Sequence, residues 1–153
     1  MPRAPQISLL EDHLGYWLRM VSNHVSHAFS QKVAGQDVTV AEWVVLRTLF
    51  ATGTTTPSRV ADEMKMTRGA ISKLVDRLLA KDLVSRRSSK EDRRWQDVAL
   101  TPSGRALVPR LAALADENDA EFFGALSDDE RAALERILKK IVRQRHMAAV
   151  PVD

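Results

Sequence analysis

The sequence of 153 residues contains no cysteine, which excludes disulfide bonds, zinc sites built on thiolates and switches that oxidise a thiol. It also contains no apolar run near the roughly 20 residues that a membrane span requires. Its N-terminus lacks the basic and then apolar pattern of a secretory signal. We therefore expect a cytoplasmic protein without a membrane partner.

Motifs of catalysis and of cofactor binding are missing as well. The sequence has no G-x-S-x-G elbow, no H-E-x-x-H pair, no P-loop and no dinucleotide-binding glycine pattern. The acidic residues at 128–130 fall in the first turn of an expected helix, where carboxylates complement the helix dipole. We therefore predict that the protein is not an enzyme and has no cofactor.

Two histidines are the nearest approach to a metal site. His24 and His27 lie three residues apart on an expected helix, a spacing that could bring both to one metal ion. No third ligand accompanies them in the sequence, so packed or solvated histidines are the simpler interpretation. We predict no metal site, and a zinc-responsive protein stays open as the alternative.

The charge of the chain is concentrated in one segment. Apolar residues make up 44% of the sequence and charged residues 28%, which at this length favours a single globular domain spanning 1–153. Residues 68–94 hold nine basic and four acidic side chains, whereas the rest of the chain holds 14 basic and 16 acidic. This asymmetry favours a polyanionic partner, with a solvated basic face as the alternative.

Capping residues followed by apolar residues three or four apart divide most of the chain into helices. Three of the caps precede a glutamate by three positions, which is the pattern of a capping box, and two precede a proline at the first helical position. Between 84 and 100, two short apolar runs flank a polar tip and predict a β-hairpin. We predict a mainly α fold with a small β-wing, its helices capped at Ser8, Thr39, Thr56, Thr67, Thr101 and Ser127.

Two short helices form a predicted helix-turn-helix at 57–81, although its turn lacks the glycine often found there. The second helix turns its apolar side to the core, and its other side presents small and basic residues that suit a DNA major groove. Asp76 is the exception, and we expect it to pair with a neighbouring basic residue. The predicted DNA contacts on this helix are Thr67, Arg68, Gly69, Ser72, Lys73 and Arg77.

The hairpin at 84–100 follows the helix-turn-helix directly and is interpreted as a wing. It adds four basic residues to the predicted DNA contacts, namely Arg86, Lys90, Arg93 and Arg94. The alternative for the run from Asp92 to Arg94 is a surface salt-bridge cluster without a ligand.

Four segments together are similar to one known family. They are T-R-G-A-I-S-K-L-V-D-R-L from Thr67, the dipeptide Leu83-Val84, the run Asp92-Arg93-Arg94, and L-T-P-S-G-R from Leu100. With the order of the helices, they resemble the MarR family of winged-helix transcription regulators over nearly the whole chain. The resemblance implies a homodimer on double-stranded DNA with a palindromic operator. It also implies that Arg94 enters the minor groove and that Asp92 holds the wing in shape.

The terminal helices support a dimer independently of the resemblance. A core built from the middle of the chain covers only part of the apolar stripes on 8–34 and 103–147, and exposed stripes of that size are unusual in monomers. We therefore assign these two segments mainly to dimerisation and residues 39–100 to a DNA-binding lobe. The alternative is a long helical bundle within one chain.

The resemblance also implies a small aromatic or anionic effector that binds between the two lobes. The residues that we expect to line such a pocket are His13, Trp17, Trp43, Arg47 and Phe50, although packing is the simpler interpretation for the aromatic ones. The predicted function is a sequence-specific homodimeric repressor that a small molecule releases from its operator. The alternatives are a zinc-responsive regulator of the same fold and a helical interaction module that does not bind DNA.

Overall fold

A computed structural model describes residues 6–88 and 96–152 of the chain. In these ranges the elements are η1 (Leu10–Asp12), α1 (Leu14–Ala34), α2 (Val40–Thr52), α3 (Pro57–Met64), α4 (Arg68–Ala80), β1 (Val84–Ser88), β2 (Gln96–Leu100), α5 (Pro102–Phe123) and α6 (Asp128–Gln144). The two strands pair antiparallel, with Val84 opposite Leu100. The predicted fold class, mainly α with a small β-hairpin, is confirmed.

Side-chain caps start five of the helices where the sequence predicts them. Four threonine caps accept a hydrogen bond from the backbone N–H three residues later, over distances of 3.0 to 3.3 Å. Ser127 and Glu130 form a complete capping box at the start of α6. The Ser127 backbone N–H, by donating to Glu130, also lowers the pKa of that carboxyl below its ordinary value.

The predicted helix start at Ser8 is wrong. The Leu9 backbone N–H donates to the Asp12 carboxylate over 2.8 Å, and this contact closes the short 3₁₀ turn η1. His13 then adopts an extended conformation, with φ −98°, so α1 begins only at Leu14. The capping contact therefore lies one residue beyond the expected one, with Leu9 and Asp12 in place of Ser8 and Glu11.

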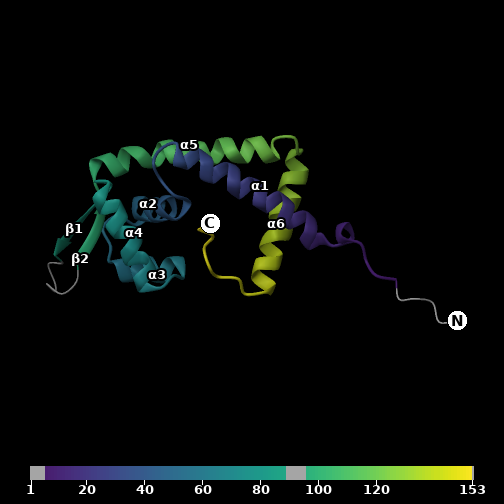
Figure 1. The fold of residues 1–153 in the computed structure, drawn as a ribbon, viewed down its shortest axis with the longest axis horizontal. Coiled ribbons are helices and arrows are strands. Elements are labelled where there is room, and N and C mark those ends of the chain that lie inside the picture. Colours follow the sequence, from purple (N-terminus) through teal and green to yellow (C-terminus); the bar gives the residue numbers. More distant parts are fainter. Residues whose placement is uncertain (1–5, 89–95, 153) are drawn as a thin grey trace.

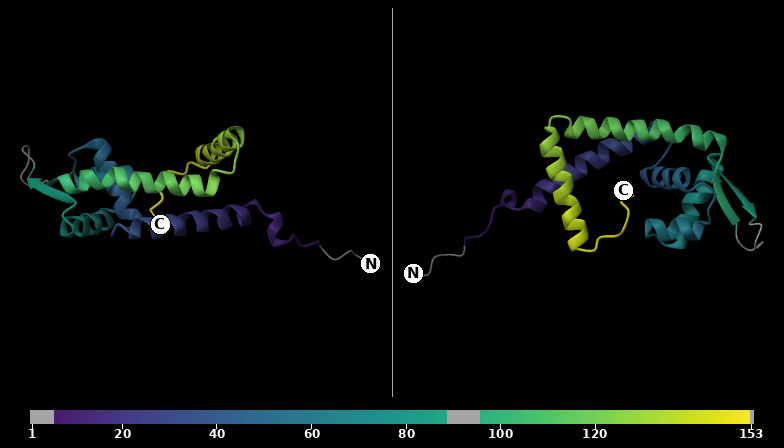
Figure 2. Two further views of the ribbon diagram at one scale, coloured as in Figure 1. Left: turned by 90° about the horizontal axis from the view of Figure 1, so that it is seen from above. Right: turned by 180° about the vertical axis from the view of Figure 1, so that it is seen from behind.

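The helices form a long upper layer above a smaller lobe (Figure 1). The upper layer consists of α1 and α5, which pack against each other. The lobe of α2, α3, α4 and the hairpin lies at one end of this layer, and α6 turns back from the other end (Figure 2). The chain after α6 returns toward α2, so the C-terminal segment lies between α6 and the lobe (Figure 1).

One hydrophobic core holds the lobe to α5. Its fully buried members come from α1, α2, α3, α4, β2 and α5 and include Leu46, Met64, Ile71, Leu78, Val98 and Leu111. The start of α5 fits closely against the chain after α4. A Cβ on Gly104 would collide with the Leu83 carbonyl oxygen, so only glycine fits at this position.

The terminal helices leave their apolar residues largely exposed. Val33 is the one buried residue of α1, and α6 has none. Leu14, Trp17 and Leu18 on α1 are at least half exposed, and Ile137 and Ile141 on α6 are also exposed. The single chain therefore does not cover these stripes, in contrast to the alternative of an intramolecular bundle. None of the described helices combines the length and apolar character that crossing a membrane requires.

Candidate DNA-binding surface

The turn of the helix-turn-helix is built without a glycine. Lys65 ends α3 in the left-handed conformation, with φ 53° and ψ 40°, which is the conformation that glycine adopts most easily. The Lys65 N–H donates to the Asp62 carbonyl, and the Met66 N–H donates to the Ala61 carbonyl over 3.0 Å. These two bonds close the turn and set the angle at which α4 leaves it.

The two faces of α4 are separated as the sequence predicts. Ile71, Leu74, Val75 and Leu78 are buried. The six predicted DNA contacts on the other face, from Thr67 to Arg77, are all exposed. A Cβ on Gly69 would meet no atom within 4 Å, so packing inside the chain does not require a glycine there. The exposed face is accessible to a partner, and its contact with DNA stays a prediction.

Two of the predicted contacts are engaged in ion pairs within the chain. Arg86 on β1 donates to the Asp76 carboxylate on α4 over 2.9 Å, which confirms that Asp76 pairs with a basic neighbour. Arg77 places its Nε 3.7 Å from the buried Glu42 carboxylate. Among the described residues, Arg68 and Lys73 form no such pair, so their charges face solvent.

The wing is described only at its two strands. Lys90, Asp92, Arg93 and Arg94 lie outside the described residues, and their predicted roles stay predictions. At the base of the hairpin, Val98 exchanges two backbone hydrogen bonds with Thr55, over 3.1 and 2.7 Å. These bonds fasten the wing to the segment that precedes α3.

Glu42 is a residue that the sequence analysis treated only as part of a capping box. Its carboxylate accepts hydrogen bonds from the Thr39 hydroxyl and from Lys81, whereas a capping box would direct it to the Thr39 backbone. The signal for this role was present in the sequence. Glu42 stands three to four residues before Val45 and Leu46, on the apolar stripe of its own helix.

A cavity of about 390 Å³ lies among α1, α2, α5 and the C-terminal segment. Val25, Phe29, Trp43 and Val44 give it apolar walls, and the Phe29 and Trp43 rings meet edge to face. The C-terminal side is formed by Val150 and Pro151.

The polar side of this cavity is organised by Asn118, which is 4% exposed. Its amide nitrogen donates to the Val25 carbonyl over 3.2 Å, and its oxygen accepts from Lys32 over 3.0 Å. Lys32 also pairs with Glu121 over 2.7 Å. These bonds join α1 to α5 beside the cavity.

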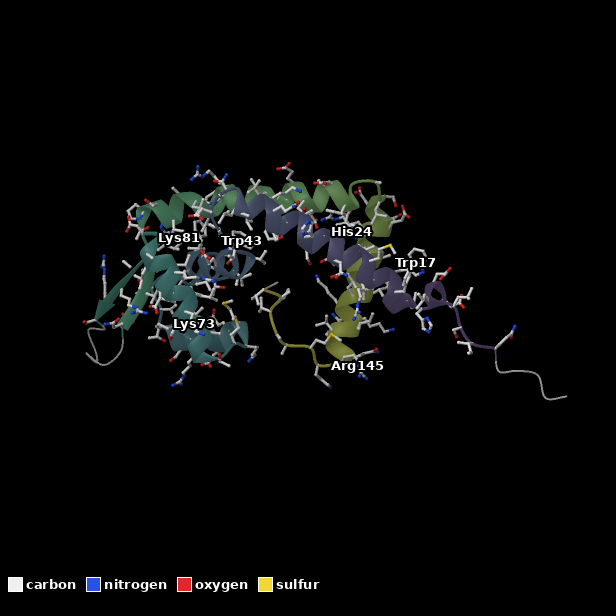
Figure 3. The ribbon with its side chains drawn as sticks, in the orientation of Figure 1. Trp17, His24, Trp43, Lys73, Lys81 and Arg145 are labelled. Carbon is white, nitrogen blue, oxygen red and sulfur yellow. The ribbon has the colours of Figure 1, made fainter. Side chains whose placement is uncertain are left out.

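The structure does not bring the expected effector residues together. Of the five, only Trp43 lines the cavity. Arg47 instead stacks over the exposed ring of Phe50. His13 precedes α1, and Trp17, far from Trp43 in Figure 3, donates its indole N–H to the Glu11 carbonyl.

The histidine pair acquires no further ligands in the described part of the chain. His24 and His27 are exposed, and the His24 ring lies 2.7 Å from the Met20 carbonyl oxygen. No group of three or more histidine, cysteine, aspartate or glutamate side chains in residues 6–88 and 96–152 is arranged to hold a metal ion. Nothing in this region therefore favours the zinc-responsive alternative.

The chain is similar to known proteins both in sequence and in structure. The MarR family model matches residues 38–95. A Thauera aromatica protein, named as a transcriptional regulatory protein for the hcr operon, is 30% identical over 132 residues, which cover 86% of this chain and 80% of that protein. A mutant of Escherichia coli MarR, solved with operator DNA, is 27% identical with a TM-score of 0.76 and covers 89% of this chain and 99% of that one.

A second similar structure concerns Bordetella bronchiseptica BpsR, whose DNA binding is described as regulated by 6-hydroxynicotinic acid. It is 28% identical with a TM-score of 0.76 and covers 89% of this chain and 97% of that chain. The similarity therefore extends beyond the helix-turn-helix into the terminal helices.

Proposed function

Since the chain belongs to the MarR family of DNA-binding, winged-helix transcription regulators, we propose that it is a homodimeric repressor of a palindromic operator that a small molecule relieves. The prediction that the protein is not an enzyme is confirmed by this membership. A regulator of this kind acts where its DNA is, and we place it in the cytoplasm.

The observation that carries the proposal is the exposed face of α4. This helix is anchored by a fully apolar inner face, so its outer face is held rigidly with Arg68, Ser72 and Lys73 toward solvent. Arginine can bind guanine through two hydrogen bonds, serine can bond to a base edge, and lysine can bind phosphate. Gly69 leaves room for the backbone to approach a base pair.

The exposed apolar stripes on α1 and α6 support the dimer. A two-fold axis would bring the same stripe of a second chain against each of them and bury both from water. The segments 8–34 and 103–147 then form the dimerisation lobe, and two copies of α4 face successive major grooves.

The cavity beside Trp43 supports a small effector. Its volume of about 390 Å³ suits a molecule with one or two rings, since ligand cavities range from about 300 to 1,000 Å³. The apolar walls from Phe29 and Trp43 favour an aromatic ring. The cavity touches both α1 of the dimerisation lobe and α2 of the DNA-binding lobe, so a ligand there would act on the angle between them.

The decisive experiment is selection of bound fragments from a random pool of duplex DNA. We expect a sequence with two-fold symmetry, and binding that weakens steeply as salt concentration rises because phosphate counterions are released. Selection of no sequence at low salt would contradict the proposal and favour an interaction module without DNA binding.

The wing provides the first site-specific prediction. Arg94→Ala should weaken operator binding and reduce the slope of log affinity against log salt by about one, because one cation is lost from the DNA surface. Fluorescence anisotropy across a salt series measures both quantities. Arg145→Ala, which removes an equal charge beyond the end of α6, is the control. Unchanged affinity and slope in the Arg94 variant would remove this residue from the interface.

A further inference from the structure

A buried carboxylate connects the recognition helix to α2. Glu42 is 1% exposed, because it lies on the buried face of α2, which is otherwise apolar. Its Oε2 accepts a hydrogen bond from Lys81 Nζ over 2.9 Å, and its Oε1 lies 3.7 Å from Arg77 Nε. Both cations belong to the C-terminal end of α4, so Glu42 fixes the end of α4 opposite to its exposed first turn.

Lys81 extends this connection to the chain that leaves α1. Its ammonium group also donates to the Asp37 carbonyl over 2.6 Å. Asp37 stands in the short connection between α1 and α2 in a left-handed conformation, with φ 58°. One ammonium group therefore joins three segments: the end of α4, the start of α2 and the connection from α1 (Figure 3 labels Lys81).

The Glu42–Lys81 ion pair contributes more to the relative orientation of the helices than to the stability of the fold. A buried ion pair recovers little more than the free energy lost when its charges leave water, and an apolar pair of similar volume is often as stable. Hydrogen-bonded charges, in contrast, hold a narrow set of distances and directions, because each donor must face its acceptor. The Glu42 carboxylate has all its partners, and no buried side-chain polar atom in the described part of the chain lacks one.

We propose that Glu42 is a positioning residue for DNA recognition, which acts through Lys81 to set the direction of α4 relative to α1. This inference rests on the proposed function. In a dimer formed through α1, the direction of α4 in each chain determines the distance between the two recognition helices. The Glu42–Lys81 pair then determines which spacing of operator half-sites is bound best.

The test uses a double variant, Glu42→Gln with Lys81→Met. The variant has the same net charge as the wild type, so it leaves the long-range attraction to DNA unchanged. It also leaves no unpaired buried charge, because both partners are neutral and similar in size to the originals. The matched control is Glu135→Gln with Lys139→Met, which neutralises an exposed ion pair on α6 in the same way.

Four quantities are measured for each protein: the thermal unfolding temperature and the affinities for the selected operator, for operators with one base pair inserted between the half-sites, and for a random duplex. The random duplex measures non-specific binding. We expect the Glu42–Lys81 double variant to unfold near the wild-type temperature, to bind the operator about tenfold more weakly, and to lose most of its preference for the wild-type spacing. The control double variant should keep affinity and preference.

Wild-type affinity and spacing preference in the folded double variant would overturn the proposal, because a purely structural pair can be replaced by a neutral one. An equal loss on operator and random duplex would overturn it too, since spacing would then play no part. If the double variant does not fold, Glu42→Gln alone gives the comparison of half-site spacings, because Lys81 can reach solvent and the added positive charge acts equally on every duplex. A wild type that selects no duplex would instead refute the proposed function itself.

Discussion

Lys65 shows how a single residue sets the geometry of the recognition helix. Its left-handed backbone costs a residue with a Cβ roughly 1–2 kcal/mol, and the fold accepts this cost at the turn that positions α4. Gly69 shows the reverse situation, because it lies where alanine would fit and would favour the helix. The two residues lead to opposite predictions.

Lys65→Gly should raise the free energy of unfolding by up to about 1 kcal/mol, because relief of the left-handed strain exceeds the greater freedom of glycine in the unfolded chain. Chemical denaturation followed by circular dichroism measures the change. Ala132→Gly on the exposed side of α6 is the control, and it should lower the same free energy by about 1 kcal/mol. A loss of stability in both variants would show that the turn holds no strain.

Gly69→Ala should stabilise the isolated protein by up to about 1 kcal/mol and yet weaken operator binding about tenfold. The added methyl group meets open space in the free chain, whereas in the proposed complex it would meet a base pair. Unfolding curves and anisotropy titrations on one preparation give both results. Undiminished binding would mean that DNA does not approach this part of α4.

At the scale of the elements, the sequence predicted contacts between residues close together in the chain, but not contacts between distant residues. The caps Thr39, Thr67 and Ser127 were predictable because each acts on a backbone N–H only three residues away. The start of α1 was not, because Glu11 and Asp12 offer two capping contacts one residue apart, and the structure forms the one between Asp12 and the Leu9 backbone N–H.

The long-range connections also escaped the sequence analysis. Glu42 meets Lys81 across 39 positions, and Asn118 meets Val25 across 93. The spacing of apolar residues along a helix carries no information about such pairings. The effector residues were predicted from helix positions alone, and only Trp43 among them lines the cavity.

The C-terminal segment gives a prediction at the same scale. Val152 packs against the core beside the cavity, so Val152→Asp should lift the segment away and expose Trp43. Quenching of Trp43 fluorescence by acrylamide, with Trp17 and Trp95 replaced by phenylalanine, should increase. Met147→Asp adds the same charge at a position that is 56% exposed, and should leave the quenching unchanged. Equal quenching in both variants would place the segment elsewhere in solution.

At the scale of the whole molecule, the proposed dimer would determine how its two recognition helices are presented to DNA. Ile141→Asp should raise the dimer dissociation constant at least about 100-fold, because a charge would be buried without a partner in the proposed interface. Sedimentation velocity over a concentration series measures the constant. Gln144→Asp adds an equal charge at the end of the same helix and is the control. A dimer that tolerates the Ile141 change would have its interface on another face.

In the proposed dimer, the exposed apolar stripes of α1 and α6 would also make gene expression depend on the amount of protein in a cell. When two chains must meet before either can hold an operator, occupancy at low abundance grows with the square of copy number. A twofold drop in synthesis then empties nearly three quarters of the occupied sites. Daughter cells that inherit unequal shares of the regulator would consequently differ in the output of the genes it controls.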